Sequence, residues 1–212
     1  MAFVIYGPGY STYVRSVRLV LEEKGAAYEL VEVDMLKGET KAPAHLVRHP
    51  FGVVPAFEHD GFALYETGAI VRYLDKVVPG PSLAPGEPKA TARMDQIMGI
   101  LDAYAYPSMI SALVMQRLLA PMLGGTPDEA VIAAALPRIR TVLAELERLR
   151  GAGPMLVGGS LSLADLMAAP IFGYLTATPE AEQLLRPHAG LRAWWQAVAA
   201  RPSMAATAPK LG

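Results

Sequence analysis

The stretch Phe51-Gly-Val-Val-Pro-Ala-Phe57, continued by Tyr65-Glu-Thr-Gly-Ala-Ile-Val-Arg-Tyr-Leu74, decides the fold of this chain. Its pattern predicts a loop, a proline, two short strands and then a helix that begins beside Glu66 and Thr67. A proline inside a sheet would forfeit a ladder hydrogen bond. We therefore expect Pro55 in an edge strand, or after a cis peptide bond where the loop enters the strand.

The second half of this stretch places an acid and a hydroxyl, Glu66 and Thr67, at a helix N-terminus. Free N–H groups and the helix dipole attract a carboxylate to such a position. Combined with the backbone edge that a proline shapes at Val54-Pro55, this predicts a binding site for a small peptide.

Composition narrows the class of protein. The chain has 212 residues, 52 % of them hydrophobic, and a net charge of −1. These values exclude disorder, and the lack of a basic balance argues against a nucleic-acid partner. There is no cysteine, so disulfides, thiolate metal sites and catalysis by the protein's own thiol are impossible. The four histidines have no metal-ligand spacing, so we expect no metal.

The chain start lacks the basic and long apolar regions of a secretory signal. No apolar run of about 18 residues is free of polar groups. We therefore expect a cytoplasmic protein that does not bind or cross a membrane.

The first 78 residues read as a βαβ unit followed by a ββα unit. A turn at Gly7-Pro8-Gly9 is followed by Ser11 or Thr12 as a helix N-cap, and Asp60-Gly61 is a hairpin signal. The expected strands are 2–6, 28–33, 54–58 and 62–65. One helix is expected to follow the cap and end at Gly25, and a second helix is expected over 69–78.

Residues 79–88 contain four prolines and read as a linker, and only helical patterns follow. In the long helix expected over 89–119, Pro107 should cause a kink or break. Thr126 is expected to cap the next helix, and Pro137 to bend it or mark a later start. Ser162 and Asp165 form a second capping box, and the last helix should end near Arg201.

This order of motifs resembles the soluble glutathione transferases. The residues that carry the likeness are Ser11-Thr12, His45 to Gly52, Val54-Pro55-Ala56, Glu66 to Tyr73 and Ser162 to Asp165. The resemblance implies a thioredoxin-like domain at 1–79, a linker at 80–88 and an all-helical domain at 89–212. The stretch 120–125 and its following helix are most similar to the phi class, whose bacterial relatives are close in length.

The chemistry implied by the resemblance requires glutathione, the co-substrate, as a thiolate. A free thiol has a pKa of about 8.5, so the enzyme must lower it. A hydroxyl at a helix N-terminus can donate to the sulfur while the dipole favours the anion. Ser11 holds that place and is implied to be the catalytic residue, although it could simply cap the helix. Thr12 is the nearest competitor, followed by Tyr10 or Tyr6.

The resemblance also implies the glutathione subsites. The main chain of Val54, set by Pro55, would pair with the cysteinyl residue. Glu66 and Thr67 would hold the γ-glutamyl end, and Lys41 the glycine carboxylate. Thr40 and Val53 stand where the phi pattern usually has histidine and glutamine, which suggests weaker glutathione binding or a shifted pose.

An electrophile pocket is expected from Tyr10 and Tyr13 together with Tyr106 and Met115. The reaction predicted is attack of the glutathione thiolate on a small apolar electrophile, by a homodimer. The alternatives are a glutathione-dependent peroxidase, isomerase or dehalogenase on the same scaffold, or a ligand carrier or interaction protein without activity.

Overall fold

The structure is a computed structural model that describes residues 2–209. The chain divides into two compact units, one of Met1–Leu83 with Arg201–Gly212 and one of Ala84–Ala200. The predicted fold class, a thioredoxin-like βαβ–ββα domain followed by an all-helical domain, is confirmed. The predicted domain limits at 1–79, 80–88 and 89–212 stay a prediction.

The first unit is built on a four-stranded sheet in the order β2-β1-β3-β4. Strands β1 and β2 pair in parallel, and β1–β3 and β3–β4 pair antiparallel. The hairpin between β3 and β4 turns at Asp60 and Gly61, whose φ angles of 47° and 83° are those of a tight primed turn. The strands are β1 Phe3–Tyr6, β2 Tyr28–Val31, β3 Ala56–His59 and β4 Phe62–Tyr65.

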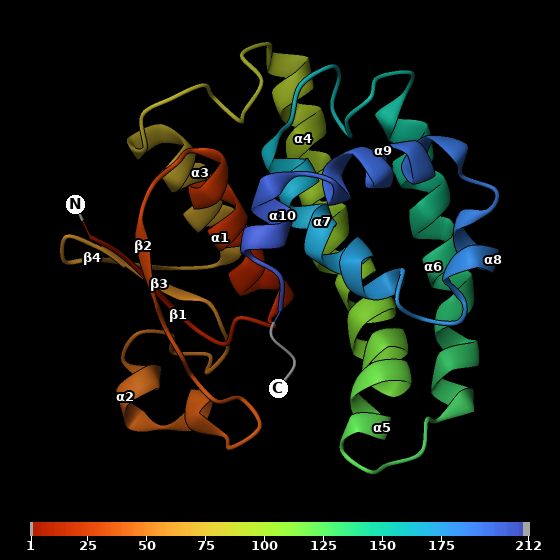
Figure 1. Cartoon of the computed structure of the whole chain (residues 1–212), viewed down its shortest axis with the longest axis horizontal. Coiled ribbons are helices and arrows are strands. Elements are labelled where there is room, and N and C mark those ends of the chain that lie inside the picture. The colour runs from red at the N-terminus through yellow and green to blue at the C-terminus, as the bar shows by residue number, and fades with distance from the viewer. Residues whose placement is uncertain (1, 210–212) are drawn as a thin grey trace. The chain divides into compact units, whose positions relative to one another are not determined.

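Two helices of the first unit, α1 and α3, lie side by side over the sheet (Figure 1). Their apolar faces supply much of the core, including Leu21 and Leu74, which are fully buried. The short helix α10, which the sequence did not predict as separate, packs on α1. The helices of this unit are α1 Thr12–Glu23, α2 Pro43–Leu46, α3 Thr67–Val77 and α10 Pro202–Ala206, with a 3-10 turn at Glu39–Lys41.

The second unit is helical throughout its regular elements. Its longest helix continues from α4 through a π-helical segment into α5, and α6 packs beside that segment (Figure 1). The core includes Phe172 and Trp194, whose rings meet edge to face. The elements are α4 Pro88–Ile100, the π-helical segment Leu101–Leu119, α5 Ala120–Met122, α6 Glu129–Arg150, α7 Leu163–Leu175, α8 Ala181–Leu185 and α9 Ala189–Ala199.

The structure of this unit differs from what the sequence predicts at Pro107, Pro137 and Thr126. The helix does not break at Pro107, because the hydrogen-bond spacing widens to the π type around it and leaves room for the ring. A later start of α6 at Pro137 is wrong, since that helix already begins at Glu129. The expected N-cap Thr126 is also wrong, because Asp128 caps α6.

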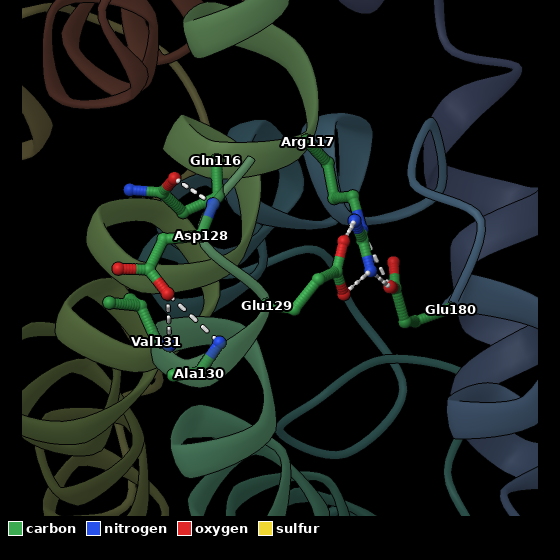
Figure 2. A network of polar contacts seen from close by, with 7 residues as sticks. All are labelled: Gln116, Arg117, Asp128, Glu129, Ala130, Val131 and Glu180. Atoms are coloured by element: carbon green, nitrogen blue, oxygen red, sulfur yellow. Dashed lines mark hydrogen bonds and ion pairs between the residues drawn. The ribbon is translucent and has the colours of Figure 1, made fainter. Parts of the chain in front are cut away.

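The start of α6 shows why Asp128 is preferred as the cap (Figure 2). Its Oδ1 accepts from the backbone N–H groups of Ala130 and Val131 at 2.9 and 3.2 Å, while its own N–H donates to Gln116 Oε1 at 2.8 Å. Glu129 does not close a box with Thr126, because Arg117 binds its carboxylate. Arg117 also donates to Glu180 at 2.7 Å and so joins three parts of the unit.

The continuous helix Pro88–Met122 is long and apolar enough, by length and composition alone, to cross a membrane. Half of its most apolar window is buried inside the fold, as in the core helix of a globular protein. This helix is therefore weak support for a membrane span.

Candidate functional site

Ser11 is the N-cap of α1, and it holds its own helix only loosely. Its Oγ accepts from the backbone N–H of Val14 at 3.4 Å, which is long for such a bond. Within residues 2–209, no hydrogen bond donated by the Ser11 hydroxyl is found. The hydroxyl hydrogen can therefore point to an external acceptor while the oxygen still faces the helix end.

The loop before Ser11 is pressed against the loop that precedes β3. Gly7 has a φ of 147°, and a Cβ added there would come within 2.6 Å of Val14 Cγ2 and 3.0 Å of Val54 Cβ. Only glycine allows that approach and that backbone conformation. The sequence thus brings the start of α1 and the Val54 loop together.

The competitors for the role of Ser11 have different surroundings. Thr12 is 5 % exposed and lies in the first turn of α1. The half-buried Tyr10 has a pKa raised by burial and further by the carboxylates of Asp34 and Glu32, so it stays a neutral phenol near neutral pH. Tyr6 lies in β1 with the Arg48 guanidinium 4.3 Å above its ring.

Pro55 follows a cis peptide bond at Val54, directly before β3 begins at Ala56. This confirms the second of the two possibilities that the sequence left open. Val54 is buried, yet its backbone N–H and C=O make no hydrogen bond within residues 2–209. Burying unpaired backbone N–H and C=O groups costs free energy unless another molecule forms hydrogen bonds with them.

The start of α3 also has backbone groups without a hydrogen-bond partner in the described chain, and we call such a helix start open. Glu66 is its N-cap, but its side chain accepts no capping hydrogen bond, and its φ of 71° is a strained value for a residue with a Cβ. Its carbonyl accepts from Ala69 and Ile70 at 3.0 Å, which leaves the N–H groups of Thr67 and Gly68 without a partner in the described chain. These donors and the helix dipole favour a carboxylate.

Lys41 ends the 3-10 turn and is exposed. Its Nζ donates to the carbonyl of Phe51 at 3.1 Å, so it crosses to the loop that leads to Val54. Thr40 beside it is buried, whereas Val53 is about half exposed at 48 %.

The predicted electrophile-pocket residues come from both compact units. Tyr10 and Tyr13 belong to the first unit, and Tyr106 and Met115 to the second. Burial raises the pKa of Tyr106, and Met115 is 40 % exposed. Their assembly into one pocket stays a prediction.

Two buried histidines, His45 and His49, lie in α2 and the loop that follows it, and one has a contact that the sequence could not reveal. His45 Nε2 lies 2.7 Å from the carbonyl oxygen of Val53. The His49 ring lies 4.8 Å from the Tyr65 ring and is tilted by 37° to it. Burial lowers the pKa of His49 more than the Glu66 carboxylate raises it. Among residues 2–209, no group of three or more acidic, cysteine or histidine residues is placed to hold a metal ion.

Two family models match this chain, the glutathione S-transferase N-terminal domain over residues 1–76 and the glutathione S-transferase C-terminal domain over residues 129–197. A probable glutathione S-transferase GSTF2 from Oryza sativa subsp. japonica is 37 % identical over 201 residues, covering 94 % of this chain and 92 % of that protein.

Two solved structures of glutathione S-transferases are similar to this chain. The structure of glutathione S-transferase-I bound with lactoylglutathione superposes with a TM-score of 0.86 at 32 % identity, covering 97 % of this chain and 98 % of the other. The maize glutathione S-transferase I in complex with an atrazine glutathione conjugate superposes with a TM-score of 0.84 at 32 % identity. The match covers 97 % of this chain and 95 % of the other.

A thioredoxin-like domain with a cis-proline edge, followed by a helical domain, defines a class of glutathione-dependent enzymes. The chain belongs to the glutathione S-transferase family, and its relatives place it in the phi class of plants.

Proposed function

We propose that Ser11 stabilises the thiolate of bound glutathione, and that the thiolate then attacks a small apolar electrophile. The observation that carries this proposal is the loose cap at α1, where the Ser11 hydroxyl has no acceptor in the described chain. A hydrogen bond from this hydroxyl and the positive end of the helix dipole both favour the anion over the thiol. The reaction otherwise needs mainly proximity.

Bound glutathione would supply hydrogen-bond partners at two places in the first unit, the Val54 backbone and the start of α3. The cysteinyl residue pairs with the N–H and C=O of Val54, which have no partner in the described part of the chain, as a peptide adds to a strand edge beside Pro55. The γ-glutamyl carboxylate binds the N–H groups and hydroxyl at Thr67, and Glu66 accepts from the γ-glutamyl ammonium. Lys41 attracts the glycine carboxylate.

The two departures from the phi pattern lie at the glycyl end. Thr40 is buried and Val53 offers no polar side-chain atom. We therefore expect glutathione to bind less tightly than it would with a histidine and a glutamine there. We further propose that within the phi class the chain is of the bacterial type, because the bacterial relatives are close to it in length.

The electrophile site is proposed to combine Tyr10 and Tyr13 with Tyr106 and Met115. Methionine adapts to irregular apolar ligands, and neutral tyrosines offer both a ring face and a hydroxyl. A panel of aryl halides, isothiocyanates and an organic hydroperoxide would separate conjugation from peroxidase activity.

The assembly is proposed to be a homodimer in the cytoplasm. Exposed aromatic and aliphatic side chains gather near the Val54 loop, where the Phe51 ring is 68 % exposed and meets Tyr65 and His49 edge-on. Light scattering on the wild type and on Phe51→Ser would test this. The same change at the exposed Leu36 is the control, and a wild-type monomer would contradict the proposal.

The experiment that tests the catalytic proposal is the Ser11→Ala variant. Loss of one donor to a developing anion typically costs about a hundredfold in turnover. We expect a fall of that size in kcat, with glutathione affinity little changed.

Ser16→Ala is the matched control, because Ser16 lies on the same helix and its hydroxyl only donates to the Thr12 carbonyl. Full activity in Ser11→Ala would overturn the proposal and direct attention to Thr12 or Tyr10.

A further inference from the structure

The peptide unit between Val53 and Val54 is held on one side by a buried histidine. His45 is 4 % exposed on the short helix α2, and its Nε2 lies 2.7 Å from the Val53 carbonyl oxygen. An oxygen lone pair faces that nitrogen, so Nε2 carries a hydrogen and donates it. Nδ1 of the same ring is buried and has no partner in the part of the chain that the structure describes.

This contact fixes the direction of a group on the other side of the same peptide. The Val53–Val54 bond is trans, since only Val54–Pro55 is cis within the described chain. In a planar trans peptide the C=O and N–H point in opposite directions. When His45 holds the Val53 carbonyl, the Val54 N–H is therefore turned away from α2, where it meets no acceptor in residues 2–209.

The remaining supports of this loop act on other peptides. Lys41 donates to the Phe51 carbonyl at 3.1 Å, and the Gly52 N–H donates to the His49 carbonyl at 2.8 Å. Neither contact touches the Val53–Val54 peptide. Since Val53 is half exposed and precedes β3, the sheet does not restrain that peptide either. His45 is thus its one side-chain restraint among the described residues.

We propose that His45 is a positioning residue for glutathione, which aims the Val54 N–H at the cysteinyl carbonyl by holding the Val53 carbonyl from behind. This inference rests on the proposed pairing of glutathione with Val54. It assigns no chemistry to the histidine itself, because the ring touches the protein and not the substrate. Because this hydrogen bond already restrains the loop, the loop loses less conformational entropy when glutathione binds.

Two substitutions at this position separate the donor from the bulk of the ring. His45→Phe keeps a flat ring and removes the donor, whereas His45→Gln keeps an N–H donor at the place of Nε2. In His45→Phe we expect the KM and the Kd for glutathione to rise about tenfold, the size expected for a lost buried hydrogen bond. The KM for the electrophile and kcat at saturating glutathione should stay nearly unchanged. In His45→Gln most of the glutathione affinity should return.

His59→Phe is the matched control. His59 Nδ1 makes a hydrogen bond of similar length, 2.8 Å, to the Tyr73 hydroxyl in the same unit. Its loss should lower thermal stability without raising the glutathione KM. All variants are assayed below their melting temperatures, with binding followed by calorimetry using S-methylglutathione, which cannot react.

The outcomes distinguish this inference from the function on which it rests. A wild type that does not bind glutathione would overturn the proposed function. A wild type that binds, with His45→Phe binding equally well, would overturn the role of His45 and leave the function intact. A rise in KM that is equal in His45→Phe, His45→Gln and His59→Phe would reveal a general loss of structure and would also overturn it.

Discussion

Two helix starts in this chain carry an acid and a hydroxyl, and they use them in opposite ways. At the start of α7, Asp165 is fully buried and accepts from the Leu156 and Ser162 N–H groups, the Ser162 hydroxyl and the Trp194 indole, at 2.6–2.8 Å. At the start of α3, Glu66 is exposed and caps nothing with its side chain.

This contrast distinguishes a helix end that stabilises the fold from one that can bind a ligand. The closed end satisfies its polar groups within the fold, so it contributes stability and offers nothing to a ligand. The open end keeps a strained φ at Glu66, and the N–H groups of Thr67 and Gly68 have no partner among residues 2–209, which lowers stability but leaves donors for a carboxylate. Residues that the fold leaves unsatisfied therefore mark the candidate site better than residue type does.

The largest expected effect comes from breaking the closed end. Asp165→Ala leaves four buried donors without an acceptor, so the free energy of unfolding should fall by about 4 kcal/mol in urea titration. Asp128→Ala is the control, because that exposed cap accepts only two hydrogen bonds and should cost about 1 kcal/mol. Equal losses in the two variants would contradict the distinction between closed and solvent-exposed caps.

A change at the open end should affect binding and leave stability nearly intact. Thr67→Val keeps the shape of the side chain and removes the hydroxyl, so the KM for glutathione should rise about tenfold. Thr141→Val in α6, where the hydroxyl only donates to the Pro137 carbonyl, is the control. A lower melting temperature of Thr67→Val with an unchanged KM for glutathione would mean that the Thr67 hydroxyl stabilises the fold and does not bind the substrate.

Low pH should reduce the stability that a second buried hydrogen-bond network, around Asp75, gives to the fold. Burial alone would raise the pKa of Asp75, but hydrogen bonds from the Leu83 N–H, Lys24 and Ser82 lower it below its usual value. Its stabilising contribution is therefore present above the unfolded pKa of about 4 and is lost as the pH falls through the lower folded value.

Urea unfolding at pH 6 and at about pH 3 should show this decrease in the free energy of unfolding. In Asp75→Asn, which cannot be ionised, the decrease between the two pH values should be smaller. The same slope in both proteins would contradict the role of Asp75.

The smallest effect is expected at Lys41, because its ammonium is exposed and screened by salt. Lys41→Met should raise the KM for glutathione by about threefold at low ionic strength, and less at high salt. Lys37→Met, which breaks an exposed pair with Asp34, is the control. A salt-independent effect would mean that Lys41 acts by holding the Phe51 carbonyl and not by its charge.

The sequence predicted those features whose signals are local. The turn at Asp60-Gly61 and the box at Ser162 and Asp165 follow from neighbouring residues. So do the cap at Ser11 and the cis bond before Pro55, each as one of two possibilities. The expected cap Thr126 failed because Arg117, twelve residues before Glu129, removes the acid that a capping box needs.

What escaped prediction depends on contacts between distant segments or on strain. The positive φ of Glu66 has no local signal, since residues with a Cβ rarely adopt it. The contact of His45 with the Val53 carbonyl needs the folded loop. The short helices α8 and α10 lack a sufficient apolar stripe of their own. The roles of Ser11 and of the glutathione-binding residues stay predictions.

The proposed function depends on the loosely capped start of α1, which lowers the pKa of the glutathione thiol through Ser11. The ultraviolet absorbance of the thiolate, titrated against pH with glutathione bound to the wild type and to Ser11→Ala, tests it directly. We predict an apparent pKa well below the free value of about 8.5 in the wild type and a return toward that value in the variant. The same lowered pKa in both proteins would contradict the claim.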